Sequence, residues 1–393
     1  MGRNEMRYTS FWDQVEMKNV EKIIGVTGNI ATGKSVLRQM LVNSRALGID
    51  ADELAHRMIY PQGPAFKTVV KTFGESILSE DGSISHNKLG QIVFNNPGAL
   101  LKLEKLVHPY VIETINERVK QSHCPLVVIE AIKLLEAGLG DICDEVWVSH
   151  ASYELQLERL LNIRNMTQRE AQRRIESQPP QSEKVTRADV VINTEGSFFS
   201  SWQQVQHALN DTIQGDTTAK LQNLTNFSEW TIQSARDLPQ GQLETFWHTN
   251  TEKDSSRLYE HLGSSRLLPL CHKGQLTAII NWENWNFTAT LKNIIPPSVF
   301  DTSPMVMFEA FQKDTELRQS EILFLSDDLA HKFGFQPSIA DFENCLKDQL
   351  VYPAWKQAAD KITTDRETSL WVKKLNDPLE SRSTTSVNYN KYL

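Results

Sequence analysis

The sequence has few cysteines and no long apolar run. Its four cysteines are scattered over 393 residues without any C-x-x-C spacing, which argues against a disulfide framework or a zinc ribbon and favours a reducing compartment. No apolar stretch approaches the ~20 residues that cross a bilayer. Residues 1–20 mix charged and aromatic side chains and contain no apolar core of a secretory signal. These absences predict a cytoplasmic protein without a membrane-spanning segment.

Basic residues are also in the minority. The chain has 41 Lys and Arg against 49 Asp and Glu, a net charge of −8, which argues against general affinity for nucleic acid or for a membrane surface. Its 40% hydrophobic and 23% charged residues are typical of a globular protein with packed cores. Because domains usually contain roughly 100–200 residues, the length predicts two or three of them.

The first half of the chain has the pattern of an α/β domain. Short β-branched runs alternate with helical patterns, which is typical of βα units around a parallel sheet. The expected strands are Lys22–Val26, Ala46–Asp50, Leu126–Glu130, Glu145–Ser149 and Asp189–Asn193. Residues 53–122 are mostly of helical pattern and too long for a simple crossover, so we expect a helical subdomain there.

The second half is expected to form a separate α+β domain. Residues Gln275–Trp282 and Asn286–Ile295 predict an antiparallel hairpin with its turn at 283–285. The boundaries that we expect are an N-terminal extension at 1–21, a first domain at 22–213, a polar linker at 214–220, a second domain at 221–375 and a flexible tail at 376–393.

The strongest motif is a full G-x-x-x-x-G-K-S match at 28–35. It follows the first expected strand and precedes a helical pattern at Val36–Asn43, which is the context that a phosphate-binding loop requires. Glycines there let backbone N–H groups surround phosphate oxygens. Lys34 is expected to reach the β- and γ-phosphates, and the Ser35 hydroxyl to coordinate magnesium. The alternative is a chance match. The predicted nucleotide-binding residues are Gly28, Asn29, Ile30, Ala31, Thr32, Gly33, Lys34, Ser35 and Val36.

The motifs that accompany this loop in GTPases are missing. Residues 87–90 read N-K-L-G and lack the aspartate of N-K-x-D, and no D-x-x-G follows the third expected strand. The length of the domain suits a small-molecule kinase better than a large ATPase.

Two acids end the second expected strand. Asp50 and Asp52 lie where parallel sheets bind ligands. An aspartate there accepts the proton of an acceptor hydroxyl or holds a magnesium-bound water, and the alternative role is a helix N-cap. We predict that Asp50 caps the helix and that Asp52 acts chemically.

Arginines mark residues 154–180 as a lid. Arg159 and Arg164 lie at the end of one helical pattern, and Arg173 and Arg174 lie on the next. A helix–turn–helix with several arginines is suited to closing over transferring phosphates. The alternative is solvated helix charge paired with neighbouring glutamates.

With these residues in hand, the first domain resembles the dephospho-coenzyme A kinase family from about Lys22 to Ser197. The motifs that carry the resemblance are, in order, Gly28–Ser35, Asp50-Ala-Asp52 with His56, Phe73-Gly74, Ile92–Phe94 with Asn96-Pro97, His108-Pro109, Glu130–Glu136, Arg159, Arg164-Asn165, Arg174-Ile175 with Gln178, and Ala188–Asn193.

The resemblance implies a P-loop NTPase fold with a five-stranded parallel sheet, an acceptor-binding helical insertion and a lid. It implies ATP- and Mg²⁺-dependent phosphorylation of the ribose 3′-hydroxyl of dephospho-CoA, with Asp52 as the general base. The residues that we assign to catalysis are Asp52, Lys34, Arg159 and Arg164. Those on the acceptor side are Asp50, Asp52, His56, His108 and Glu130, while Arg174 joins the nucleotide-binding set and Glu130 joins Ser35 as a magnesium ligand.

The chain departs from the family's usual D-x-P-L-L-x-E run. Glu130 replaces the aspartate, Ile132 the proline and Lys133 an apolar residue. Val36 replaces a usual threonine after the phosphate-binding loop, and Asn165 replaces a usual aspartate in the lid. These departures keep two alternatives open, a kinase of another nucleoside or small hydroxylated acceptor and a non-catalytic nucleotide- or CoA-sensing module.

The second domain weakly resembles a GNAT-type acyltransferase. The likeness covers Ser234–Pro239, the expected hairpin, a helix at Met305–Phe311 and a closing strand and helix at 321–335. That family binds acetyl-CoA on a glycine-bearing loop, but residues Pro296–Pro304 contain no glycine and no arginine. We therefore expect a degenerate, structural or regulatory domain. The oligomeric state does not follow from the sequence.

Overall fold

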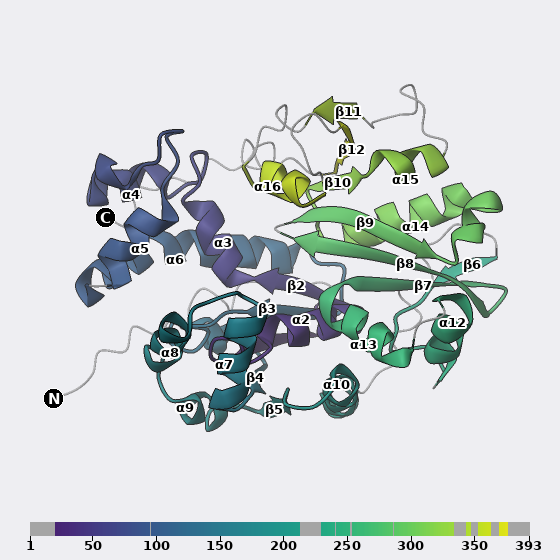
Figure 1. The fold of residues 1–393 in the computed structure, drawn as a ribbon, viewed down its shortest axis with the longest axis horizontal. Helices are drawn as coiled ribbons and strands as arrows, with labels where there is room; N and C mark the ends of the chain where they lie inside the picture. The colour runs from purple at the N-terminus through teal and green to yellow at the C-terminus, as the bar shows by residue number, and fades with distance from the viewer. Residues whose placement is uncertain are drawn as a thin grey trace. The chain divides into compact units, whose positions relative to one another are not determined.

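The structure is a computed structural model that forms two compact units (Figure 1). It describes residues 20–94, 96–212, 229–239, 241–251, 254–285, 287–333, 343–346, 353–362 and 369–375. The first unit contains Met1–Thr217 and Ser256–Ser264, and the second contains Thr218–Ser255 and Ser265–Leu393. Most of the expected N-terminal extension, and the whole linker at 214–220 and tail at 376–393, lie outside the described residues.

A five-stranded parallel sheet forms the centre of the first unit. Its strands are β1 (Lys22–Thr27), β2 (Ala46–Asp50), β3 (Leu126–Glu130), β4 (Glu145–His150) and β5 (Val190–Asn193). The order β2-β3-β1-β4-β5 puts β1 in the middle, so both of its neighbours end beside the loop that follows it. The sequence prediction of five parallel strands is confirmed, with ends that differ by one residue at most.

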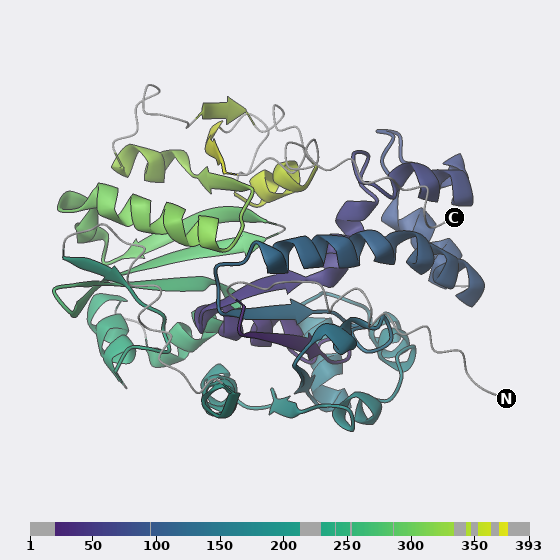
Figure 2. The same cartoon turned by 180° about the vertical axis from the view of Figure 1, so that it is seen from behind.

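Residues 34–212 contain nine α-helices, some packed on this sheet and others on the helical insertion beside it. They are α2 (Lys34–Asn43), α3 (Ala51–Met58), α4 (Phe66–Phe73), α5 (His86–Phe94), α6 (Pro97–Lys120), α7 (Tyr153–Asn162), α8 (Gln168–Glu176), α9 (Gln181–Val185) and α10 (Phe198–Thr212). Helices α3 to α6 occupy the helical stretch expected at 53–122, and α4 and α5 lie beside α6 (Figure 1). Seen from behind, α6 is one long helix (Figure 2). Asn96 caps it by accepting hydrogen bonds from two backbone N–H groups of the first turn.

A helix from the second half of the sequence, α13 (Ser255–Ser264), belongs mainly to the first unit. The Asn43 Nδ2 group of α2 donates a 2.8 Å hydrogen bond to the backbone oxygen of Leu262. The ring of Phe199 lies 4.7 Å from that of Tyr259, centroid to centroid. A Cβ at Gly263 would lie 2.9 Å from Cγ1 of Val36. The valine that replaces the family's usual threonine therefore contacts α13.

The second unit contains a seven-stranded mixed sheet. Its order is β11-β12-β10-β9-β8-β7-β6. The strands are β6 (Trp230–Ile232), β7 (Arg266–His272), β8 (Gln275–Trp285), β9 (Thr288–Ile295), β10 (Ile322–Leu325), β11 (Glu343–Leu346) and β12 (Ser369–Lys374). Strands β6 to β9 are antiparallel neighbours, and β10 pairs parallel with β9. The other α-helices of the described residues are α12 (Gln242–Thr251), α14 (Pro304–Leu317), α15 (Asp327–Lys332) and α16 (Pro353–Ile362).

The predicted hairpin of β8 and β9 is present, but its predicted turn was wrong. Residues 283–285 extend β8 and pair with residues 288–290 of β9. Phe287 has a φ of 60° just before β9 begins. A backbone that reverses with a positive φ fixes the turn there, and Lys292 stabilises the extension through an ion pair with Glu283 at 3.0 Å.

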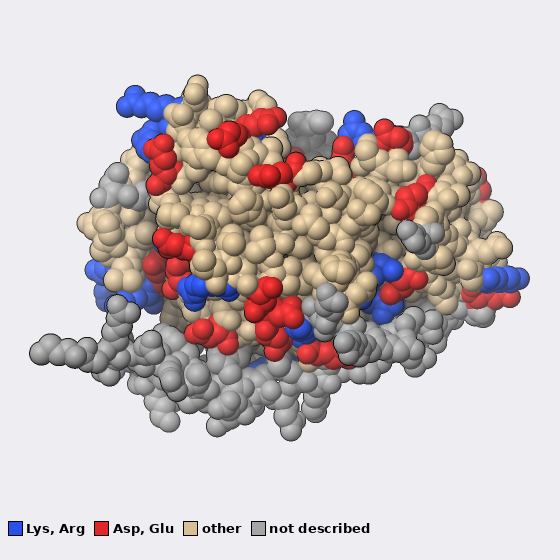
Figure 3. Space-filling view, turned by 90° about the horizontal axis from the view of Figure 1, so that it is seen from below, with Lys and Arg blue, Asp and Glu red and all other residues tan. Residues whose placement is uncertain are grey.

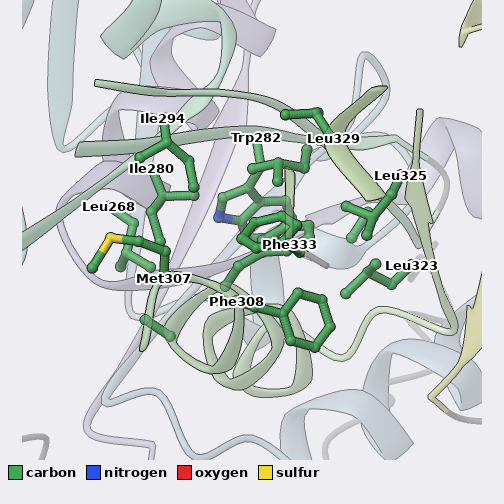
Figure 4. Close-up of a cluster of buried hydrophobic side chains, with 14 of the residues drawn as sticks. Leu268, Ile280, Trp282, Ile294, Met307, Phe308, Leu323, Leu325, Leu329 and Phe333 are labelled. Atoms are coloured by element: carbon green, nitrogen blue, oxygen red, sulfur yellow. The ribbon is translucent and has the colours of Figure 1, made fainter. Parts of the chain in front are cut away.

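The core of the second unit holds a buried ion network on α14. Leu268, Ile280, Met307 and Phe308 pack around Trp282 (Figure 4). In contact with this apolar core, the Asp314 carboxylate accepts hydrogen bonds from Arg266 Nε and Trp282 Nε1, each at 3.0 Å. Burial opposes ionisation of Asp314, but Arg266, Arg318 and the Trp282 hydrogen bond together hold its pKa below the usual value.

Charge on the surface is mixed in sign. Figure 3 shows one face on which basic and acidic side chains are interspersed among the residues drawn in colour. Among the described helices, none is both long enough and apolar enough to cross a membrane. Of the described cysteines, Cys124, Cys143 and Cys271 are free.

We expect Gly263→Leu to destabilise the first unit by about 1–3 kcal/mol, because its side chain overpacks the contact between α13 and Val36. The measurement is chemical denaturation of the full chain. Ser264→Leu is the matched control, since Ser264 is exposed on the same helix, and should change stability by no more than about 0.5 kcal/mol. Equal effects of the two variants would contradict the packing of α13.

We expect Asp314→Asn to destabilise the second unit by about 3–5 kcal/mol, because it leaves two buried arginines without a counter-charge. Since the pKa of Asp314 is lower in the folded chain, the stabilisation is present above the unfolded pKa and is lost as the pH falls through the folded pKa. Urea unfolding at neutral and acidic pH measures both effects. Glu309→Gln, an exposed change on the same helix, should leave the stability unaltered at both.

Candidate active site

The phosphate-binding loop joins β1 to α2. Gly33 has a φ of 94° and occupies the N-cap position of α2. At Gly28, a Cβ would lie 2.6 Å from Ser149 Oγ and 2.7 Å from the Ser149 carbonyl oxygen, so a larger residue does not fit. The Lys34 Nζ group donates a 3.0 Å hydrogen bond to the Asn29 carbonyl oxygen within the loop. Burial lowers the pKa of Lys34 against the opposing charges of Glu130 and Asp52.

Side chains from the lid and from the start of α9 hold the phosphate-binding loop in place. The Gln178 Oε1 atom accepts a 2.7 Å hydrogen bond from the Ile30 N–H, and Gln181 Oε1 accepts one of 3.3 Å from the Asn29 N–H. Arg159 donates to the Ala31 carbonyl oxygen at 2.9 Å. The loop therefore has its shape fixed by α7, α9 and the segment between α8 and α9.

The predicted lid arginines differ in their surroundings. Arg159 also donates to the backbone oxygen of Thr194 at 2.6 Å, so its guanidinium joins the loop to the end of β5. Arg164 is exposed in the turn before α8 and is close enough to Lys34 to affect its pKa. Arg174 is exposed and pairs with Glu170 one turn earlier at 2.9 Å. Of the three, the structure brings Arg159 into direct contact with the loop.

Asp50 ends β2, Asp52 lies in the first turn of α3, and the two acids have different hydrogen-bond partners. Asp50 is the N-cap of α3 and accepts a 3.0 Å hydrogen bond from the Glu53 N–H. Burial and the charge of Glu130 raise the pKa of Asp50 to about 7. Asp52 Oδ2 accepts a 3.0 Å hydrogen bond from the Ile132 N–H. Burial raises the pKa of Asp52, while that hydrogen bond and Lys34 oppose the rise.

Glu130 connects the end of β3 to α2. Its Oε1 accepts a 2.8 Å hydrogen bond from Ser35 Oγ, and its Oε2 accepts one of 2.7 Å from Arg38 Nε. Glu130 is only 3% exposed, and Arg38 compensates for the cost of burying its charge. The extra methylene of glutamate over aspartate gives the carboxylate the reach to contact both partners.

Two predicted histidines lie on the helical insertion. His56 of α3 contacts the ring of His86, with centroids 4.9 Å apart, and burial followed by the charge of His86 lowers its pKa. Burial also lowers the pKa of His108 on α6, which lies near Asp52 and Lys133. Lys133 forms a 2.6 Å ion pair with Glu104 of α6.

Sequence reasoning missed four residues that the structure adds to this site. They are Arg38, Gln181, Lys184 and Thr194. The spacing of Arg38 three residues after Ser35 was the one available signal, because residues i and i+3 share a helix face. Lys184 is 4% exposed and lies near both Asp52 and Lys34, a placement that depends on long-range packing.

The comparisons with known proteins agree with this geometry. The family model for dephospho-CoA kinase matches residues 22–199. A dephospho-CoA kinase of Carboxydothermus hydrogenoformans is 41% identical over 186 residues, which cover 47% of this chain and 90% of that protein. This chain belongs to the dephospho-CoA kinase family. A relative of the same name from Geobacter sulfurreducens is 38% identical over 178 residues, covering 44% of this chain and 90% of that protein.

Two solved structures show a more distant likeness to parts of the chain. Dephospho-CoA kinase from Campylobacter jejuni is 24% identical, with a TM-score of 0.34 over 49% of this chain and 98% of that one. A GNAT family acetyltransferase from Elizabethkingia anophelis is 18% identical, with a TM-score of 0.23 over 38% of this chain and 99% of that one.

We expect Arg159→Lys to loosen the phosphate-binding loop, because lysine cannot make the forked contacts to Ala31 and Thr194. Loss of such charged hydrogen bonds should speed amide exchange of residues 28–33 about tenfold. Hydrogen–deuterium exchange of the full chain measures this. Arg173→Lys is the control, since Arg173 is exposed on α8. Unchanged exchange in Arg159→Lys would show that the arginine does not hold the loop.

Proposed function

We propose that the first unit transfers the γ-phosphoryl group of ATP to the ribose 3′-hydroxyl of dephospho-CoA, giving CoA and ADP. The observation that carries this proposal is the carboxylate of Asp52, which is fixed by the Ile132 N–H and lies within electrostatic reach of Lys34 in a chain of the dephospho-CoA kinase family. A base and a phosphate-binding lysine so arranged suit an in-line transfer to a hydroxyl. The proposal includes a cytoplasmic location, which the scattered cysteines of the sequence favour.

The loop residues and the lid supply the binding of the nucleotide. The backbone N–H groups at the N-terminus of α2 and the Lys34 ammonium attract the β- and γ-phosphates. Arg159 keeps the loop in its binding shape through Ala31. Arg164 and Arg174 are exposed on the lid, and when the lid closes their positive charges approach and stabilise the phosphoryl group in transfer.

Asp52 acts as the general base in this proposal. Its raised pKa makes it a better proton acceptor than an exposed aspartate, since burial disfavours the charged form. His56 of α3 and His108 of α6 bind the acceptor, dephospho-CoA. Asp50 caps α3 and so fixes the first turn of the helix on which Asp52 lies.

Ser35 and Glu130 are the residues that would hold Mg²⁺. A hydroxyl and a carboxylate are the hard oxygen donors that this ion prefers, and they lie 2.8 Å apart with Ser35 exposed. The ion supplies charge neutralisation of the phosphates when bound. Arg38 holds Glu130 in position, because its guanidinium donates to the second carboxylate oxygen.

A second candidate is a kinase of another hydroxylated acceptor. Lys133 favours it, because this lysine replaces an apolar residue of the family pattern and lies near His108, which is itself near Asp52. A panel of nucleosides and dephospho-nucleotides compared with dephospho-CoA separates the two candidates, since the better substrate has the higher kcat/KM.

The test is ADP release from MgATP with and without dephospho-CoA. We expect dephospho-CoA to stimulate release strongly, and Asp52→Asn to lower the stimulated rate ~100-fold or more. Lys34→Ala should abolish it by removing the charge that binds the phosphates. The control Glu80→Gln makes a similar carboxylate-to-amide change at an exposed position of the insertion and should keep the full rate. ATP binding without any acceptor-stimulated release would instead identify a nucleotide-sensing module.

A further inference from the structure

The peptide group of Ile132 has polar partners on both sides. Its N–H donates to Asp52 Oδ2 at 3.0 Å. Its carbonyl oxygen accepts from Thr27 Oγ1 at 3.1 Å and from the ammonium of Lys184. One peptide therefore connects the predicted base to the end of β1 and to α9.

The carbonyl side of this peptide is held by buried groups. Thr27 is fully buried and Lys184 is 4% exposed. Lys184 also contacts Glu136 Oε1 at 3.2 Å, so its own position is fixed from a second direction. The preceding residue, Ala131, is hydrogen-bonded to β1, the strand that contains Thr27, because its N–H donates to the Val26 carbonyl oxygen at 3.1 Å. With these contacts in place, the peptide plane cannot rotate without breaking buried hydrogen bonds.

The N–H side acts on a single oxygen of Asp52. A hydrogen bond to one carboxylate oxygen fixes the rotation of the group and leaves the other oxygen for a proton from an acceptor. Such a bond is available only because residue 132 is not proline, which has no N–H. The family's usual pattern places proline here, so this donor is a feature of the present chain.

We propose that the Ile132 peptide, clamped through its carbonyl by Lys184 and Thr27, is a positioning group that orients Asp52 for proton transfer. This inference rests on the proposed function, in which Asp52 is the base. Ile132 and Lys184 act through Asp52 and are not themselves catalytic residues.

The titratable groups near Asp52 come from five elements. They are Lys34 of α2, Asp50 of β2, Glu130 of β3, Lys184 of α9 and His108 of α6. The Ile132 hydrogen bond, Lys34 and Lys184 lower the pKa of Asp52, whereas burial and Glu130 raise it. Removing the N–H donor or the charge of Lys184 therefore raises the pKa of the base, and the acid limb of the rate profile must move to higher pH.

The experiment compares Ile132→Pro with Ile132→Val in the full chain, using the pH dependence of kcat/KM for dephospho-CoA. Proline removes the donor and is expected to fit the segment, since it is the family's usual residue there. Valine keeps the N–H. We expect the acid limb to move up by about one pH unit and kcat to fall about tenfold in Ile132→Pro, with KM for MgATP unchanged. Ile132→Val should keep the wild-type profile.

A second pair of variants tests the clamp independently. Lys184→Met should move the acid limb to higher pH, as Ile132→Pro does. Lys184→Arg should leave the acid limb at the wild-type pH, because arginine keeps the charge and the donors. An acid limb that stays at the wild-type pH in both Ile132→Pro and Lys184→Met overturns the inference, even if their rates fall.

The outcome is separable from that of the proposed function. Absence of dephospho-CoA-stimulated ADP release in the wild type would overturn the function itself, and a full rate in Asp52→Asn would overturn the base assignment and this inference with it. If the wild type is stimulated and Asp52→Asn is inactive, the position of the acid limb decides the role of the Ile132 peptide alone.

Discussion

Three carboxylates and three cations meet at the carboxyl edge of the first sheet, and each is partly or wholly buried. The carboxylates are Asp50, Asp52 and Glu130, and the cations are Lys34, Arg38 and Lys184. Burial of any one of these charges alone would cost several kcal/mol. Groups of opposite sign lie close together here, which offsets part of this cost and positions the site before any ligand binds.

The parallel sheet is what brings these groups together. Asp50 and Glu130 are register partners at the ends of β2 and β3, although 79 residues of other structure lie between them. Strand β1 pairs with β3 on the other side of that strand from β2, ends beside Glu130 and leads into the phosphate-binding loop. Because the carboxyl ends of parallel strands share one edge, a nucleotide-binding loop and an acidic cluster are adjacent in this fold without any further device.

The sequence predicted the parts of this site that depend on local pattern. The loop at 28–35, the cap at Asp50 and five strands follow from short stretches whose spacing has a direct physical meaning. Arg38 and Lys184 did not follow, because their roles depend on which distant carboxylate or carbonyl the fold brings within reach. The turn after β8 was wrong for a related reason, since polar residues 283–284 are paired across the hairpin instead of reversing the chain.

Several departures from the family pattern make specific contacts in the structure. Glu130 is longer than aspartate, and its two oxygens contact Ser35 and Arg38. Val36 has lost a hydroxyl and lies against Gly263 of α13, a helix contributed by the second half of the chain.

Ile132 follows the same logic, because it adds an N–H that Asp52 accepts. A chain that was losing its site would be expected to leave such buried polar groups unpaired, since nothing would maintain their partners. Here Glu130, Ile132 and Lys133 each have a specific polar partner. The altered residues therefore fit a site that has been rebuilt around the same charges better than one in decay.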